Sequence, residues 1–274
     1  MPKHAFRVAY DGQGYHGFQR QPDVDTISDT FLDALAALDI HDENIPPGYA
    51  ASGRTDAGVS AVAQTIAFDA PKWLTPEAIN TYLPDDIIVW AYTTVPEEFH
   101  PTHDAVRRRY EYLLYPDGHL DTSRLESAIT RLSGYHDFHN LTLDSTGTHR
   151  DLTIEFQLDD PYIVLQFESD GFPRQFVRRA VSLLRMIATG ARDLAFIDRV
   201  LSDQPLPGPD GIAPASPLPL LLVDVVYSNR SFQPSNAVEN HVSTFTKFHK
   251  QHLLRAGVVS RISDRIQDLS VESA

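Results

Sequence analysis

The chain has 274 residues, a length that fits two domains, and its hydrophobic content of 42% allows a sizeable core without any apolar run long enough to span a membrane. It contains no cysteine, which excludes disulfides and thiolate chemistry, and its short polar N-terminus predicts no signal or transit peptide, so we expect a cytoplasmic protein. The 37 acids exceed the 23 bases, of which only 4 are lysine, and this acidic surface argues against general nucleic-acid binding and indicates a salt-adapted host.

The first part of the chain predicts short strands mixed with helices. Residues 4–10 alternate in polarity as a half-buried strand does, and they end in glycine-rich turn residues. Apolar residues at helical spacing predict a helix over 27–38, capped by Thr26 or Ser28. The remaining predicted elements of this part are loops at 46–48 and 53–58, strands at 62–68 and 87–92, and a short helix at 76–83.

The pattern restarts near residue 105 with a strand at 108–115. Ser123 and Glu126 form a capping-box pattern that predicts the start of the next helix. A strongly amphipathic helix over 176–187 is expected to end at Gly190. The other predicted elements are strands at 152–158, 162–168 and 220–227 and a proline-rich loop at 205–219.

This order lacks the strict strand–helix repetition of a parallel sheet. It predicts an α+β protein of two units, each an antiparallel sheet with helices on one face. The expected boundaries are 1–105 for the first half and 106–239 for the second, with a tail at 240–274 that has no clear place in the core. A cleft between the two halves is the expected place for chemistry.

Asp56 lies in a loop between Gly53 and Gly58, and taken alone it could be a turn residue that accepts backbone hydrogen bonds. The string GRTDAGV at 53–59, however, resembles the signature of the TruA family of tRNA pseudouridine synthases. Further strings resemble later motifs of that family in the same order, and together they span about residues 4–228. They are YDGQGYHGFQRQ from Tyr10, FHPTHDAVRRRYEYLL from Phe99, GYHDFHNL from Gly134 and GFPRQFVRRAV from Gly171.

The resemblance implies the pseudouridine synthase fold, in which two similar antiparallel-sheet halves with helices on one face meet at a central cleft. It implies a homodimer that holds tRNA and uses neither a metal nor an organic cofactor. The reaction would break the C1′–N1 bond of a uridine and rejoin the ring through C5. The expected targets are uridines of the anticodon stem-loop, around positions 38 to 40.

Asp56 matches the catalytic aspartate of the family. A carboxylate beside C1′ can act as a nucleophile, stabilise oxocarbenium-like character or remove a proton, and the sequence leaves these three routes open. Tyr110 matches the tyrosine that packs against the target base, and Arg54 matches an arginine that can hold phosphate or fill the space of a flipped base. Arg108, within Arg107–Arg109, is a further candidate for contact with the RNA backbone.

Two positions depart from the family pattern. Ser60 stands where relatives commonly have histidine, and Ser182 stands where the late helix usually carries an arginine that pairs with the catalytic aspartate. Arg178 lies one helical turn before Ser182, and Arg179 lies three residues before it. We expect one of these two arginines to supply the charge that keeps Asp56 ionised.

Three other interpretations each start from a single feature. The Ser60 and Ser182 departures would fit a catalytically impaired tRNA-binding protein or chaperone of the same fold. A glycoside hydrolase built on Asp56 needs a second nearby carboxylate, which no motif supplies. His136, His139 and His149 could suggest a metal site, but without cysteine or paired carboxylates they read as structural, so no metal site is predicted.

Overall fold

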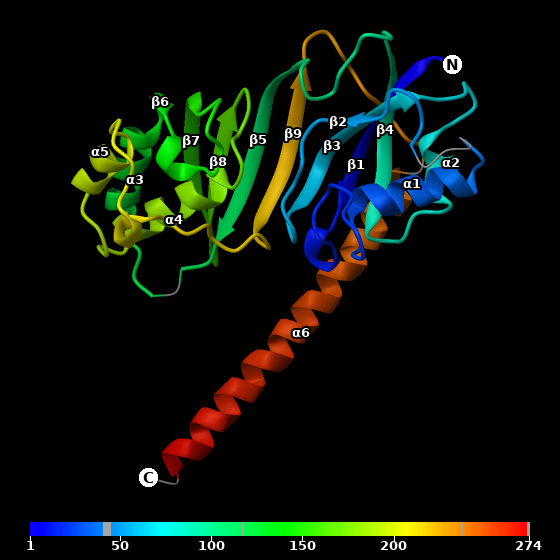
Figure 1. The fold of residues 1–274 in the computed structure, drawn as a ribbon. Helices are drawn as coiled ribbons and strands as arrows, with labels where there is room; N and C mark the ends of the chain where they lie inside the picture. Colours follow the sequence, from blue (N-terminus) through cyan, green and yellow to red (C-terminus); the bar gives the residue numbers. More distant parts are fainter. Residues whose placement is uncertain (41–44, 117, 237, 273–274) are drawn as a thin grey trace.

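One hydrogen-bonded sheet of ten strands runs through the computed structural model, which describes residues 1–274 except 41–44, 117, 237 and 273–274. Its order is β10-β4-β1-β3-β9-β5-β8-β7-β6, with β2 beside β3 (Figure 1). The strands are β1 (Lys3–Tyr10), β2 (Ala50–Ala51), β3 (Ser60–Asp69), β4 (Ile87–Val95), β5 (Ala105–Leu114), β6 (Gly134–Asp137), β7 (His149–Asp159), β8 (Tyr162–Ser169), β9 (Leu220–Tyr227) and β10 (Gln233–Pro234).

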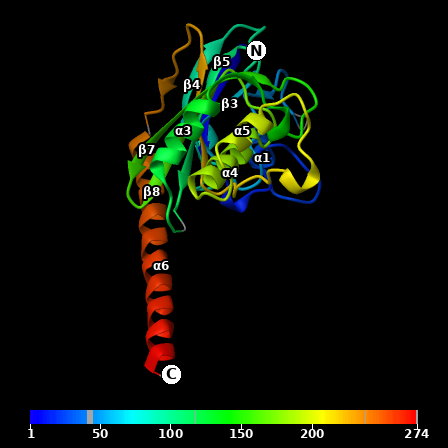
Figure 2. The same ribbon diagram turned by 90° about the vertical axis from the view of Figure 1, so that its left-hand side faces the viewer.

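The helices pack mainly on one face of this sheet, where Figure 2 shows α1, α3, α4 and α5 together. They are α1 (Ile27–Ala37), α2 (Pro76–Asn80), α3 (Thr122–Leu132), α4 (Phe176–Ala188), α5 (Ala195–Val200) and α6 (Val238–Glu272), with 3-10 turns η1 (Gly12–Gly14), η2 (His139–Leu141) and η3 (Gly208–Asp210). The expected α+β class with helices on one face is therefore confirmed. Among the described strands every pairing is antiparallel except that of β3 with β9.

Most predicted elements are present, and the differences at helix ends have local causes. Thr26 caps α1 by accepting a hydrogen bond from the Asp29 amide, as one of the two expected caps. The capping-box prediction for α3 was wrong, because the cap is Asp121, whose carboxylate accepts from the amides of Ser123 and Arg124. Asp121 outcompetes Ser123 since a carboxylate is the stronger acceptor at a helix N-terminus.

Strand β9 joins the two parts of the sheet. It comes late in the chain, yet it lies between β3 and β5, so the predicted halves form one continuous sheet. Its parallel pairing with β3 is short and involves Ser60 with Leu221 and Ala61 with Leu222. Arg7 of β1 spans this seam, because its guanidinium donates to the carbonyls of Ala63 (2.9 Å) and Val225 (2.5 Å).

Two hydrophobic cores lie under the helices. One packs α1 and α2 on β1, β3 and β4, and the other packs α3, α4 and α5 on β5, β7 and β8. Tyr110 of β5 contacts both cores, so it marks the place where they meet. The predicted boundary between 105 and 106 falls at the start of this same strand.

The predicted tail at 240–274 is largely the helix α6, which leaves the body and extends away from it in both views (Figures 1 and 2). Residues 273–274 of that tail lie outside the described part. Of the helices in the described residues, none is both long and apolar enough to cross a membrane.

Gly12 allows a close approach that any side chain would block. A Cβ at this position would lie 2.1 Å from the carbonyl oxygen of Val59, on the loop before β3. We predict that Gly12→Ala lowers the free energy of unfolding by about 1–3 kcal/mol, the usual effect of overpacking. Gly14→Ala is the matched control, since a Cβ there meets no atom within 4 Å. Equal melting temperatures for the two variants would contradict the prediction.

Candidate active site

The loop at 53–59, between β2 and β3, is held from beneath by buried polar side chains. The Ser52 hydroxyl donates to Gln64 Oε1 at 2.6 Å, and Gln64 Nε2 donates to the Gly53 carbonyl at 3.0 Å. The hydroxyls of Tyr10 and Thr55 are hydrogen-bonded at 2.8 Å. Because these groups are buried and mutually satisfied, they fix the backbone of the loop on either side of Arg54.

A second set of contacts joins the loop to residues 12–18. The Phe18 amide donates to the Thr55 carbonyl at 3.0 Å, and the Gly58 amide donates to the Tyr15 carbonyl at 3.2 Å. Ser60 Oγ accepts from the Gly12 amide at 3.0 Å. Ser60, which replaces the expected histidine, therefore has a defined part in holding this turn.

Asp56 forms an ion pair with Arg178. Arg178 Nη1 donates to Asp56 Oδ2 at 2.7 Å, and both side chains are largely shielded, with 28% of the Asp56 surface and 13% of the Arg178 surface exposed. The remaining face of the guanidinium is held by the 205–219 loop, since Arg178 Nε donates to the Ala215 carbonyl at 2.7 Å. Asp56 Oδ1 has no hydrogen-bond partner among the described residues, so this oxygen is available to a substrate.

Arg179, the other candidate partner of Asp56, points elsewhere. Its guanidinium donates to the Ile212 carbonyl at 2.5 Å and to Gln175 Oε1 at 3.2 Å. Gln175 precedes α4 with a φ of 61°, in the left-handed region that non-glycine residues seldom adopt. Arg179 thus braces the start of α4, while Arg178, on the same first turns, reaches the carboxylate.

Tyr110 lies beside this pair at the meeting point of the two cores. Its ring packs edge-on against Phe172, with centroids 5.3 Å apart. Burial raises the pKa of Tyr110 to about 12, Arg108 opposes that rise and Asp56 adds to it. The phenol is therefore neutral at physiological pH and offers an aromatic face rather than a charge.

The remaining predicted arginines differ in availability. Arg54 is exposed and forms no ion pair among the described residues. Arg108 donates to the carbonyls of Thr102 (2.8 Å), Ser52 (3.0 Å) and Asp170, so its guanidinium is used in joining loops. Its neighbours Arg107 and Arg109 both pair with Glu168, at 3.0 and 2.7 Å. The cluster is thus mostly engaged within the protein.

Sequence reasoning missed the residues that support the loop. Gln64 is fully buried within a strand whose other inward positions are mostly apolar, and this interruption was the available signal. Ala215 gave no signal, because it contributes only its backbone carbonyl to Arg178.

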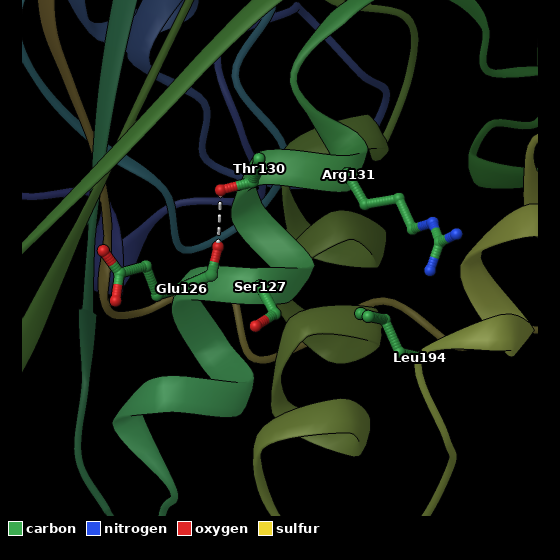
Figure 3. A pocket seen from close by; sticks show the side chains of 5 residues that line it. All are labelled: Glu126, Ser127, Thr130, Arg131 and Leu194. Carbon is green, nitrogen blue, oxygen red and sulfur yellow. Dashed lines mark hydrogen bonds between the residues drawn. The ribbon is translucent and has the colours of Figure 1, made fainter.

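The histidines and a surface hollow beside α3 lie outside this site. His139 and His149 face Asp137, at 3.2 and 3.9 Å, and no group of three or more possible metal ligands occurs in the part of the chain that the structure describes. A hollow of about 520 Å³ is lined by residues of α3 and by Leu194. Figure 3 shows Glu126 and Arg131 pointing away from each other around it, and none of the predicted site residues contributes.

Comparisons with known proteins identify the relatives of the chain. The family described as tRNA pseudouridine synthase matches residues 128–228. The chain is 50% identical to tRNA pseudouridine synthase A of Halobacterium salinarum over 265 residues, which cover 96% of this chain and 99% of the relative. It is 48% identical to the protein of that name from Haloarcula marismortui, over 96% and 98% of the two chains.

Relatedness extends beyond halophilic archaea. A tRNA pseudouridine synthase A of Methanothrix thermoacetophila is 31% identical over 97% of this chain and 99% of the relative. Among solved structures, a Cbf5-Nop10-Gar1 complex aligns with a TM-score of 0.36 and 11% identity, over 67% of this chain and 45% of that one. On the strength of the near full-length matches, the chain belongs to the tRNA pseudouridine synthase family.

Proposed function

We propose that Asp56 is the carboxylate with which this enzyme isomerises uridine to pseudouridine in tRNA. The observation that carries the proposal is the ion pair with Arg178, which occupies Oδ2 and leaves Oδ1 open. A guanidinium 2.7 Å away favours the ionised carboxylate, the form that each of the three routes requires. The ion pair also opposes the alternative of an impaired site, because Arg178 supplies the charge that Ser182 lacks.

The chemistry rearranges bonds within the nucleotide. The C1′–N1 bond breaks, the detached ring turns while the enzyme holds both fragments, and C5 bonds to C1′. C5 then loses its proton and N1 gains one, so the product is an isomer of uridine. Asp56 Oδ1 can bond to C1′ transiently, support the positive charge that develops there, or remove a proton during the rearrangement. Tyr110 offers its ring to the displaced base, and stacking compensates part of the energy of leaving the RNA helix.

The other parts of the proposal concern binding. Arg54 is the exposed cation next to Asp56 and is proposed to contact phosphate or the space left by the base. Arg179 and Arg108 are proposed to act through the loops that they hold. We propose the anticodon stem-loop, around positions 38 to 40, as the target, on the basis of the resemblance alone.

We also propose a cytoplasmic homodimer. The absence of cysteine fits a reducing compartment. Exposed apolar residues near one end of β5, β7 and β8 support self-association, because such a group is seldom left in water. They are Leu113, Tyr115, Leu158 and Tyr162.

Asp56→Asn tests the central proposal. The amide keeps the shape of the side chain but removes its charge, so we expect tRNA binding to persist and pseudouridine formation to fall on the order of 10⁴-fold or more. Turnover is measured on an unmodified tRNA transcript at high salt, and mapping the product identifies the target position. Asp203→Asn, in an exposed loop, is the matched control and should retain wild-type turnover. Unchanged turnover in Asp56→Asn would exclude this residue as the catalytic carboxylate.

Arg178→Ala removes the charge-assisted hydrogen bond to Asp56. Such bonds contribute roughly 1.5–3 kcal/mol, so we expect kcat to fall about 10- to 150-fold. Arg178→Lys should recover only part of the loss, because an ammonium cannot copy the two directed donors of the guanidinium. Arg185→Ala, on an exposed position of the same helix, is the control. Full activity of a folded Arg178→Ala variant would count against the proposed pairing.

Tyr110 should act through its ring. The hydroxyl has no hydrogen-bond partner among the described residues, so Tyr110→Phe is expected to keep most of the activity. Tyr110→Ala should remove the stacking on one base, about 1–3 kcal/mol, which corresponds to a reduction of roughly 5- to 150-fold in kcat/KM. Because the phenol stays neutral up to a pKa of about 12, the wild type and Tyr110→Phe should share one pH profile from neutral to moderately alkaline pH. A large reduction in Tyr110→Phe would assign the hydroxyl a role.

A further inference from the structure

Phe172 lies in the short segment at 170–175 that joins β8 to α4, and the chemistry described above assigns it no part. It is half-buried, and its ring meets that of Tyr110 edge-on, with an interplanar angle of 86° and centroids 5.3 Å apart. Aromatic rings favour this arrangement because the positive edge of one ring faces the negative face of the other. The contact therefore holds the two rings in a defined relative orientation.

Tyr110 depends on packing for the orientation of its ring. Its hydroxyl has no hydrogen-bond partner among the described residues, so no polar contact there fixes the rotation of the side chain. Within the part of the chain that the structure describes, Phe172 is the aromatic ring that pairs with Tyr110. An edge-on ring is a directional contact, and Phe172 is therefore the neighbour best suited to set the plane of the phenol.

Phe172 in turn rests on the C-terminal core. Its ring stacks on Phe176, the first residue of α4, with centroids 6.0 Å apart, and Phe176 meets Phe138 edge-on at 4.9 Å. Phe176 and Phe138 are 1% and 0% exposed. The rings thus form a continuous series from the buried core to Tyr110, and a close-packed core holds such a series with little freedom to move.

The backbone on both sides of Phe172 is also held. The Asp170 carbonyl accepts a hydrogen bond from Arg108 of β5. On the other side, the Arg174 amide donates to Asp144 Oδ2 at 2.7 Å. The position of Phe172 is therefore set from β5 at one end of the segment and from the loop before β7 at the other.

The same segment serves both parts of the proposed site. Arg178 follows Phe176 by two residues on α4 and forms the ion pair with Asp56. The start of one helix therefore places both the cation that pairs with the carboxylate and the aromatic neighbour of Tyr110. A shift of this helix would move the carboxylate partner and the base-facing ring together.

We propose that Phe172 is a positioning residue that fixes the ring of Tyr110 in the plane in which it receives the target uracil. This inference rests on the proposed function, because it requires Tyr110 to contact the base. Stacking of a ring on a base depends on the angle between their planes. A tyrosine that is free to rotate would lose part of this contact, and Phe172 prevents that rotation.

A residue that only fills the core is the alternative interpretation of Phe172. Such a residue would affect stability, and any effect on turnover would not depend on whether position 110 carries a ring. A double-mutant cycle separates the two interpretations, because residues that act through each other show non-additive effects.

The test combines Phe172→Ala with Tyr110→Ala in the full-length protein and measures kcat/KM on an unmodified tRNA transcript at high salt. We expect Phe172→Ala alone to lower kcat/KM about 2- to 12-fold, the range that corresponds to one edge-on aromatic pair. In a chain that already carries Tyr110→Ala, adding Phe172→Ala should lower kcat/KM no further. Phe172→Tyr, which keeps the ring, should retain most of the activity, whereas Phe172→Leu should lose about as much as Phe172→Ala.

Phe156→Ala is the matched control, because Phe156 of β7 is another half-buried ring that packs against the same core. It should leave kcat/KM at the wild-type value, and melting temperatures show that each variant is folded during the assay. A folded Phe172→Ala variant with wild-type kcat/KM would overturn the inference, and so would an equal loss from Phe172→Ala with and without Tyr110→Ala. Unchanged kcat/KM in Tyr110→Ala alone would reject the proposed role of Tyr110, and this inference with it.

Discussion

The seam between β3 and β9 is the constraint on which the site depends. A parallel contact of two residue pairs brings the loop at 53–59 in front of the first turn of α4, although the two are more than a hundred residues apart. Such a short ladder contributes little by itself, and the buried guanidinium of Arg7 reinforces it by binding carbonyls on both strands. The ring of Phe232 covers that guanidinium, with the Arg7 Cζ atom 4.3 Å from the ring centroid, and this shields the seam from water.

Asp56 is consequently positioned from two independent directions. Buried polar side chains of the N-terminal core hold the backbone of the loop at 53–59. The cation that pairs with the carboxylate is Arg178 of α4, a helix that packs in the C-terminal core. A carboxylate held in this way requires little reorganisation when charge develops on a bound ribose, and such preorganisation is a main source of catalysis in general. The departures at Ser60 and Ser182 are local, because the hydroxyl of Ser60 accepts from the Gly12 amide and Arg178, one turn before Ser182, pairs with Asp56.

The order of strands and helices and the location of Asp56 could be predicted from the sequence. Periodicity identified the major elements because their buried faces are regular, and the loop carried a specific string of residues. The insertion of β9 between β3 and β5 could not be predicted, since strand pairing across such a separation leaves no local pattern. The choice of Arg178 over Arg179 was also beyond the sequence, because it depends on the contact of Arg179 with Gln175 and on the backbone carbonyl of Ala215 that accepts from Arg178.

Arg178 donates to both Ala215 and Asp56, and this need for a guanidinium fits the arginine-rich, lysine-poor composition of the chain. Proteins with acidic, lysine-poor surfaces have exchanged flexible ammonium groups for other side chains, and here arginine outnumbers lysine 19 to 4. Because Arg178 donates to both Asp56 and Ala215 through one planar guanidinium, a lysine ammonium could replace it only in part. Adaptation of the surface to salt and retention of the Asp56–Arg178 ion pair therefore place no opposing demands on the same residue.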